Sequence, residues 1–97
     1  MAVGLALRIL TPEGVALSEE AISVIGPGER GYLGVLRNHA PLVTTLVPGK
    51  LTWQRTSGER KTVQLGAGFL EVVHNRLTVL TDRFAETAFP PIRQVPG

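Results

Sequence analysis

Cysteine is absent from this sequence, which excludes disulfide bridges and thiolate metal sites. The absence also fits a reducing compartment. Aromatic residues are scarce, because the 97 residues include one Trp, one Tyr and three Phe. So few rings do not make a persuasive stacking platform for single-stranded nucleic acid. We expect Tyr32 and Trp53 to serve in the core or in an exposed contact patch instead.

Long apolar runs and clusters of charge are missing as well. No stretch approaches the ~20 apolar residues that a membrane-spanning helix needs, and the apolar start, Met1 to Leu7, is too short for a signal peptide. We therefore expect a soluble or peripheral protein. Ten Lys and Arg against eight Asp and Glu give a net charge of +2, with no run of three basic residues. Because nucleic-acid binding needs clustered positive charge, the composition does not favour that function.

Turn-forming residues and a period-two alternation of apolar residues are abundant. The 11 Gly and 7 Pro predict many short elements, and no helical window of useful length precedes Asp82. Nine segments read as strands separated by turns: 5–9, 15–18, 21–25, 32–36, 42–47, 51–54, 62–65, 68–73 and 77–82. This spacing predicts an all-β fold, a nine- to ten-stranded β-sandwich or flattened barrel. We expect one domain over 1–84 and a Pro-rich tail over 85–97.

The segment 26–31 matches the dinucleotide-binding pattern Gly-x-Gly-x-x-Gly. That pattern needs a helix directly after it, because the helix N-terminus holds the pyrophosphate. Here a strand and a turn are expected to follow, so we interpret the segment as a Gly-rich loop between strands and expect no nucleotide site.

Catalytic and metal-binding constellations are not evident. The two histidines, His39 and His74, have no nearby ligands that would complete a metal site. Ser18, Ser23 and Ser57 lie at expected strand ends or turns, without the base and orienting group that nucleophilic catalysis requires. We interpret His74 as a turn residue and His39 as a structural or surface residue. The sequence therefore predicts a protein that is not an enzyme and has no cofactor and no metal.

Two segments are specific enough to suggest a family. The first, 31–49, reads Gly-x-x-Gly-Val-Leu-x-x-His-Ala-Pro-Leu and ends on Pro-Gly; the second, 66–82, contains Gly-Phe-Leu-Glu-Val. Together with the opening Leu-Arg-Ile-Leu-Thr-Pro-Glu-Gly, they resemble the N-terminal β-sandwich of the epsilon subunit of F-type ATP synthases, whose mitochondrial counterpart is called delta. The resemblance runs over roughly residues 4 to 85.

The resemblance implies a structural rotor subunit of the central stalk, which couples ion translocation to ATP synthesis. Such a subunit sits against the gamma subunit and on the ring of c subunits. It is peripheral at the cytoplasmic face of a bacterial membrane, or on the matrix side in mitochondria. Carried onto this sequence, the resemblance implies c-ring contacts at Glu29, Arg30, Tyr32, Arg37 and Asn38, and gamma contacts at Thr11, His39 and Leu42. We also expect an exposed apolar patch that joins part of 42–46 to the Thr11 end.

This sequence departs from the family in three places. Tyr32 stands where an acidic residue is frequent, and Arg37-Asn38 stands where Pro-Gly is usual. The family's C-terminal helical hairpin has no counterpart, because Pro90, Pro91 and Pro96 oppose a helix. The chain is then either a naturally short form or one cut before the hairpin; the Pro-rich tail favours the short form, which would be without the helical mode of inhibition. The alternative, from another class, is a stand-alone β-barrel or sandwich that binds nucleic acid or a small ligand.

Overall fold

The computed structural model describes residues 4–86, and these residues contain ten strands and no helix, so no helix there could span a membrane. The strands are β1 Leu5–Thr11, β2 Gly14–Ala21, β3 Ser23–Gly28, β4 Gly31–Leu36, β5 Leu42–Leu46, β6 Gly49–Gln54, β7 Arg60–Leu65, β8 Gly68–Val73, β9 Arg76–Thr81 and β10 Phe84–Ala85.

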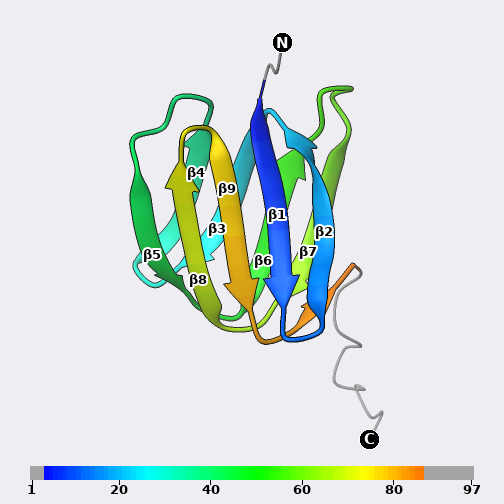
Figure 1. Ribbon diagram of the computed structural model, residues 1–97, viewed down its shortest axis with the longest axis vertical. Coiled ribbons are helices and arrows are strands. Elements are labelled where there is room, and N and C mark those ends of the chain that lie inside the picture. The colour runs from blue at the N-terminus through cyan, green and yellow to red at the C-terminus, as the bar shows by residue number, and fades with distance from the viewer. Residues whose placement is uncertain (1–3, 87–97) are drawn as a thin grey trace, which may run out of the picture.

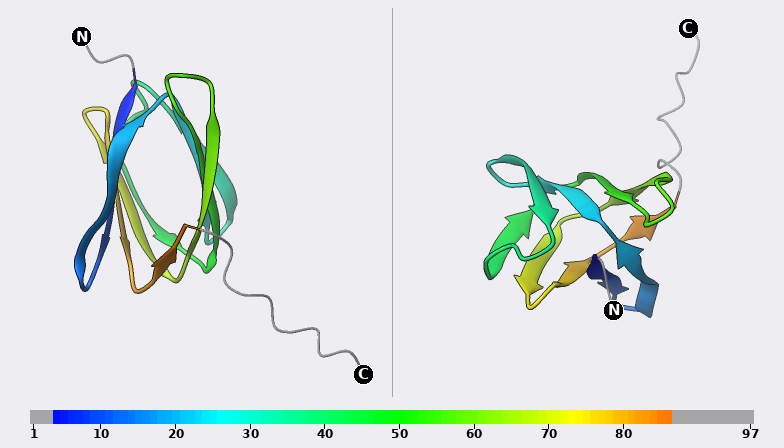
Figure 2. Two further views of the ribbon diagram at one scale, coloured as in Figure 1. Left: turned by 90° about the vertical axis from the view of Figure 1, so that its right-hand side faces the viewer. Right: turned by 90° about the horizontal axis from the view of Figure 1, so that it is seen from above.

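The strands form two facing layers, as the side view in Figure 2 shows. One layer has the order β5-β8-β9-β1-β2, and the other has β10-β7-β6-β3 with β4 on the free side of β3 (Figure 1). All the pairings are antiparallel except that between β1 and β9. The layers are joined at the end of β3, where Gly28 pairs with Leu46 of β5. The main-chain N of Val47 also donates to Pro27 O at 2.9 Å.

The core lies between the two layers and follows from the alternation in the strands. In β1, for example, Leu5, Leu7 and Ile9 are fully buried, while Ala6 and Arg8 point outward. The largest buried side chain is Trp53 of β6, which is 1% exposed. Besides these four, the buried apolar residues are Ala21, Val24, Val35, Leu46, Leu51, Val63, Leu65, Leu70, Val72, Leu77 and Val79.

The expected all-β sandwich is confirmed, and so is the tight turn between 68–73 and 77–82. His74 and Asn75 have φ values of 50° and 61°, and Val73 pairs with Arg76 directly across them. A two-residue hairpin loop with positive φ at both central positions matches the right-handed twist of the flanking strands. His74 is thus a turn residue, as the sequence predicts.

The interpretation of 26–31 as a loop is wrong in detail. Gly26, Pro27 and Gly28 belong to β3 and pair with Leu33, Tyr32 and Gly31 of β4, so that only Glu29 and Arg30 form the turn. Pairing with β4 outweighs the poor strand propensity of Gly and Pro, which depends strongly on context.

The region after Asp82 contains a short strand that the alternation does not reveal. Phe84 and Ala85 pair with Leu65 and Gln64 of β7. Two residues are too few for a period-two pattern to be recognised. The remainder of the expected tail, 87–97, lies outside the described residues, and so do Pro90, Pro91 and Pro96.

Gly68 should be intolerant of substitution, because a Cβ there would collide with the main-chain O of Leu80. We expect Gly68→Ala to lower the free energy of unfolding by about 1–3 kcal/mol, measured by urea denaturation. Gly34→Ala is the matched control, since a Cβ at Gly34 meets nothing within 4 Å; its effect should stay within about 0.5 kcal/mol. Equal losses in the two variants would contradict this account of Gly68.

Candidate functional site

An apolar row crosses the outer face of the layer β5-β8-β9-β1-β2. The strand registers align Phe69 with Leu80, Leu80 with Leu10, and Leu10 with Val15. Phe69, Leu80 and Val15 are 54%, 50% and 55% exposed, although each is large and apolar. We call Val15, Leu10, Leu80 and Phe69 the apolar row. Leu10 between Leu80 and Val15 is partly buried. The four apolar side chains lie in line across the sheet as one contiguous patch, and exposed apolar patches mark binding surfaces.

The apolar row has a hollow at one end and charged residues along one side. A shallow hollow of about 440 Å³, with a mostly apolar lining, includes Leu10, Phe69 and Leu80 together with Thr11 and Pro12. In the neighbouring register line, Val43 is followed by Glu71, Thr78 and Arg8. An apolar centre with a polar rim is the usual anatomy of a protein–protein interface.

The expected patch near 42–46 and Thr11 is present, with different members at its centre. In β5 the outward apolar residue is Val43, which is 69% exposed, whereas Leu42 is partly buried and packs against the core. Thr11 follows Leu10 of the row in β1, lines the same hollow, and ties the β1–β2 turn. Its Oγ1 donates to Glu13 Oε1 at 3.1 Å, and Glu13 N donates back to Oγ1 at 3.3 Å.

A second candidate surface is the β3–β4 hairpin, which carries three of the expected ring contacts. Glu29 and Arg30 form its turn, Gly31 follows with φ 120°, and Tyr32 is 69% exposed. These residues line a hollow of about 290 Å³ that Leu42 and Thr44 of β5 close from the other side. The hairpin and β5 thus present one continuous surface.

The other two expected ring contacts lie at the opposite end of β4. Arg37 and Asn38 follow Leu36, after the six residues of the strand. The loop there is fixed to the β8–β9 turn, because Asn38 N donates to Asn75 Oδ1 at 2.6 Å and Asn75 Nδ2 donates to Asn38 Oδ1 at 3.4 Å. The five residues therefore form two groups rather than a single loop. At about 3.3 Å per residue, the five residue steps from Tyr32 to Arg37 separate the groups by about 16 Å.

His39, an expected gamma contact, directly follows Asn38 of the second group. Its Nδ1 lies 2.7 Å from Ala40 O, and because a carbonyl oxygen only accepts, Nδ1 carries the proton. His39 and His74 line one hollow of about 300 Å³ with Asn38 and Asn75. Across residues 4–86 no three His, Cys, Asp or Glu side chains gather where they could hold a metal ion. The Gly-x-Gly-x-x-Gly segment continues into β4, not into a helix.

The apolar row could not be assigned from alternation alone. Leu70 and Val72 define the buried phase of β8, and Leu77 and Val79 define that of β9. Phe69 and Leu80 are apolar in the opposite phase. A strand with one solvated face normally carries polar residues at the positions that face solvent. An apolar residue at such a position is therefore the feature of the sequence that can indicate a docking face.

Comparisons with known proteins show which family the chain resembles. A family model described as "ATP synthase, Delta/Epsilon chain, beta-sandwich domain" matches residues 4–87. The "ATP synthase epsilon chain" of Moorella thermoacetica is 47% identical over 76 residues, which cover 78% of this chain and 57% of the relative. The protein of the same name from Desulfosudis oleivorans is 40% identical over 82 residues, covering 84% of this chain and 62% of the relative. The chain thus spans less than two thirds of the length of these relatives.

Solved structures share the fold at low sequence identity. A chain of the Euglena gracilis mitochondrial ATP synthase superposes with a TM-score of 0.81 and 21% identity, over 88% of this chain and 54% of that chain. A chain from the Tetrahymena thermophila mitochondrial ATP synthase, in a structure of its central stalk and c-ring, gives 0.76 and 15%, over 95% and 73%.

The tie between Asn38 and Asn75 can be tested at the main-chain N–H of Asn38. Asn75→Gly keeps the positive φ but removes the acceptor, so we expect faster hydrogen exchange at Asn38 and a loss of about 0.5–1.5 kcal/mol in the free energy of unfolding. Asn75→Asp retains Oδ1 and should leave the exchange rate close to that of the unchanged protein. Slow exchange in Asn75→Gly would show that the tie does not hold the loop.

Proposed function

The chain belongs to the delta/epsilon chain family of ATP synthases through its β-sandwich domain, and we propose that it is a non-catalytic rotor subunit of the central stalk of an F-type ATP synthase. The observation that carries the proposal is the apolar row, an exposed apolar surface on a chain whose family match covers residues 4–87. A subunit that transmits torque must be held by its neighbours, and apolar contact supplies that attachment without a catalytic residue.

The gamma subunit is the proposed partner of the outer face of β5-β8-β9-β1-β2. The apolar row and Val43 supply the buried area, and Glu71 and Arg8 beside them supply a polar rim. Thr11 lies at one end of this face and His39 near the other. A contact at both residues would therefore run along the length of the layer. Leu42 would contribute indirectly, because it packs against the core and supports the exposed Val43.

The c-ring is the proposed partner of the β3–β4 hairpin, through Glu29, Arg30 and Tyr32. Its turn projects a carboxylate, a guanidinium and an exposed phenol within four residues. Tyr and Arg are enriched at binding hot spots because each combines a large contact area with hydrogen bonding. Arg37 and Asn38, at the far end of β4, form a separate contact group in this proposal.

The proposed subunit acts without cofactor, metal or nucleic acid. It reaches the membrane only through the ring, as a peripheral component on the cytoplasmic face in a bacterial-type complex. Its contribution to ATP synthesis is mechanical, because it couples the ring to gamma and acts on the catalytic head only indirectly. The proposal depends on two docking faces that can be altered separately.

Removing apolar area from the proposed gamma face should weaken gamma binding without unfolding the sandwich. We expect Phe69→Ser with Leu80→Ser to reduce affinity for purified gamma at least about tenfold, since truncating a buried anchor residue typically costs 1–2 kcal/mol or more. The matched control is Ile25→Ser with Leu36→Ser, which removes exposed apolar side chains from the other layer. Affinities are measured by calorimetry. Equal losses in both double variants would contradict the assignment of this face.

The two groups of proposed ring contacts should act independently. We expect Tyr32→Ala and Arg37→Ala each to lower the yield of assembled complex, and the double variant to show the sum of the two free-energy losses. Additivity is expected because sites more than about 10 Å apart rarely couple. Assembly is measured by copurification with tagged c subunits, and thermal melts check the fold. Unchanged assembly in the double variant would rule out both residues as anchors. It would not bear on the proposed gamma face.

A further inference from the structure

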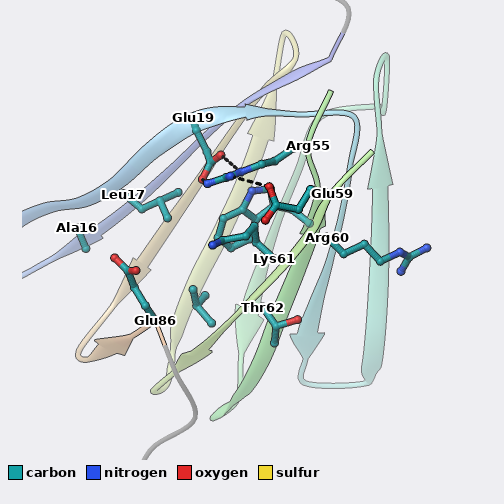
Figure 3. Close-up of a pocket in the computed structure, with 11 residues that line it drawn as sticks. Ala16, Leu17, Glu19, Arg55, Glu59, Arg60, Lys61, Thr62 and Glu86 are labelled. Carbon is teal, nitrogen blue, oxygen red and sulfur yellow. Dashed lines mark hydrogen bonds and ion pairs between the residues drawn. The ribbon is translucent and has the colours of Figure 1, made fainter. Parts of the chain in front are cut away.

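The sandwich has an open side between β2 and β7. Within residues 4–86, β2 pairs only with β1, and β7 pairs with β10 only at Gln64 and Leu65. The stretch Arg60–Val63 of β7 is therefore joined to β6 alone. A cavity of about 480 Å³ lies at this side, lined by both layers (Figure 3). We call it the lateral cavity; its lining is Ala16, Leu17, Glu19, Trp53, Arg55, Glu59, Arg60, Lys61, Thr62, Val63 and Glu86.

One set of charges in the lateral cavity is already matched. Arg55 Nε and Nη2 donate to the two oxygens of Glu19 at 2.7 and 3.3 Å, and Nη1 donates to Glu59 at 2.9 Å. In Figure 3, Glu19 and Glu59 converge on Arg55, whereas Arg60 points away from them. The hydrogen bond to Glu19 is the main cause that raises the pKa of Arg55 above its ordinary value. This cluster joins β2 to the β6–β7 turn and leaves its three members satisfied.

Two donors in the cavity are not matched. Trp53 Nε1 is buried and has no hydrogen-bond partner among the described residues. A buried N–H without an acceptor is costly, and native structures rarely keep one. Lys61 stands directly across from Trp53 in the β6–β7 register, so its side chain leaves the sheet on the same inner face. No carboxylate among residues 4–86 forms an ion pair with it. Glu86 is the lining carboxylate outside the Arg55 cluster, and it forms no ion pair with Lys61. Among residues 4–86, Trp53 Nε1 therefore has no acceptor and Lys61 has no paired carboxylate.

We propose that the edge Arg60–Val63 is a strand-addition site for an acidic, extended peptide segment of a partner protein. A free strand edge offers main-chain donors and acceptors to any extended chain, while the side chains of that chain select the partner. The volume of the cavity suits a few inserted side chains. An inward carboxylate supplies both the acceptor that Trp53 Nε1 lacks and the charge that Lys61 lacks.

The register of such a strand follows from β10. Phe84 and Ala85 already run antiparallel along β7 opposite Leu65 and Gln64, and the chain bends at Glu86. A partner strand continuing this line meets Val63, Thr62, Lys61 and Arg60 in that order. Residues opposite Val63 and Lys61 point into the cavity, so the acidic residue belongs at the third position. The residue opposite Thr62 faces outward beside the Thr52–Thr62 hydroxyl pair, whose oxygens are 3.0 Å apart, which favours Thr there.

The proposal goes beyond the docking of gamma and the ring, and its failure would leave that function unaffected. The edge of β7 lies in the other layer from the apolar row, and β6 and β3 separate it from β4 (Figure 1). β2 carries Val15 of the apolar row, but the proposed strand pairs with β7 and not with β2. The partner is defined by chemistry alone: an extended segment with an apolar residue, a Thr and then an acidic residue.

The single tryptophan provides a direct measurement. The probe is acetyl-Val-Thr-Glu-Thr-amide, and the protein is the 97-residue chain labelled with ¹⁵N. We expect the indole N–H resonance of Trp53 to shift on titration, and the amides of Arg60 to Val63 to become protected from exchange. The same peptide with Gln in place of Glu should bind about two- to fivefold more weakly, as expected for a cross-strand charge pair.

Two protein variants complete the test. Lys61→Glu should reverse the preference, so that a peptide with Lys at the third position binds better than the original. Lys50→Gln is the control, because Lys50 is exposed on the outer face of the same layer; it should change nothing. The proposal would be overturned if the indole N–H resonance of Trp53 did not shift up to about 10 mM peptide. Equal binding of the Glu and Gln peptides would also overturn it.

Other occupants would also be visible in the same experiment. An indole shift that depends on protein concentration without peptide would mean that a second copy pairs along β7. Peptide binding that appears only when the chain is cut after Glu86 would mean that residues of this chain cover the edge themselves. Either result would overturn the assignment to a partner.

Discussion

The corner at the end of β3 is the constraint on which both proposed docking surfaces depend. The first half of β3 pairs with β6 in one layer, and Gly28 pairs with Leu46 in the other. Glu29 N donates to Thr45 O at 3.1 Å and Val47 N donates to Pro27 O at 2.9 Å, which extends the ladder around the bend. Gly28 is needed there, since a Cβ would lie 2.8 Å from Gly31 O. The corner places β4 at the edge of one layer and β5 at the edge of the other, so the β3–β4 hairpin and the apolar row belong to different layers.

The elements of this fold were largely predictable, and the reason is visible in β1. A strand with one buried face must alternate, and Leu5, Leu7 and Ile9 do so without exception. Prediction was poorer where tertiary pairing decides the structure. Gly26 to Gly28 has the composition of a loop but becomes a strand because β4 returns alongside it. Phe84 and Ala85 form a strand only because the edge of β7 is available.

The candidate site was less predictable than the fold. Exposed residues near Thr11 and 42–46 were expected, yet Leu42 faces the core and its neighbour Val43 faces outward. A shift of one residue exchanges the two faces of a strand, so a motif can mark a segment without showing which side chain is presented. The apolar row joins residues that lie far apart in sequence, from Val15 to Leu80, and only the strand registers bring them into line.

Different interactions join the two layers at the two sides of the sandwich. On the side of β3 and β5 the layers share main-chain hydrogen bonds around the corner. On the side of β2 and β7, Ile22 N donates to Gln54 O at 2.8 Å at one end, and the ion pair between Arg55 and Glu19 lies nearby, with side chains 36% and 24% exposed. No main-chain pairing joins β2 to β7 among residues 4–86. A partly exposed ion pair contributes on the order of 0–1 kcal/mol and weakens with salt, whereas strand pairing saturates groups that would be costly to leave unpaired. The side of β2 and β7 is therefore the weaker closure. On the same side, Trp53 Nε1 has no acceptor, and β7 has a neighbour beyond β6 only at Gln64 and Leu65. A strand added along Arg60–Val63 would therefore strengthen the sandwich where its two layers are least firmly joined.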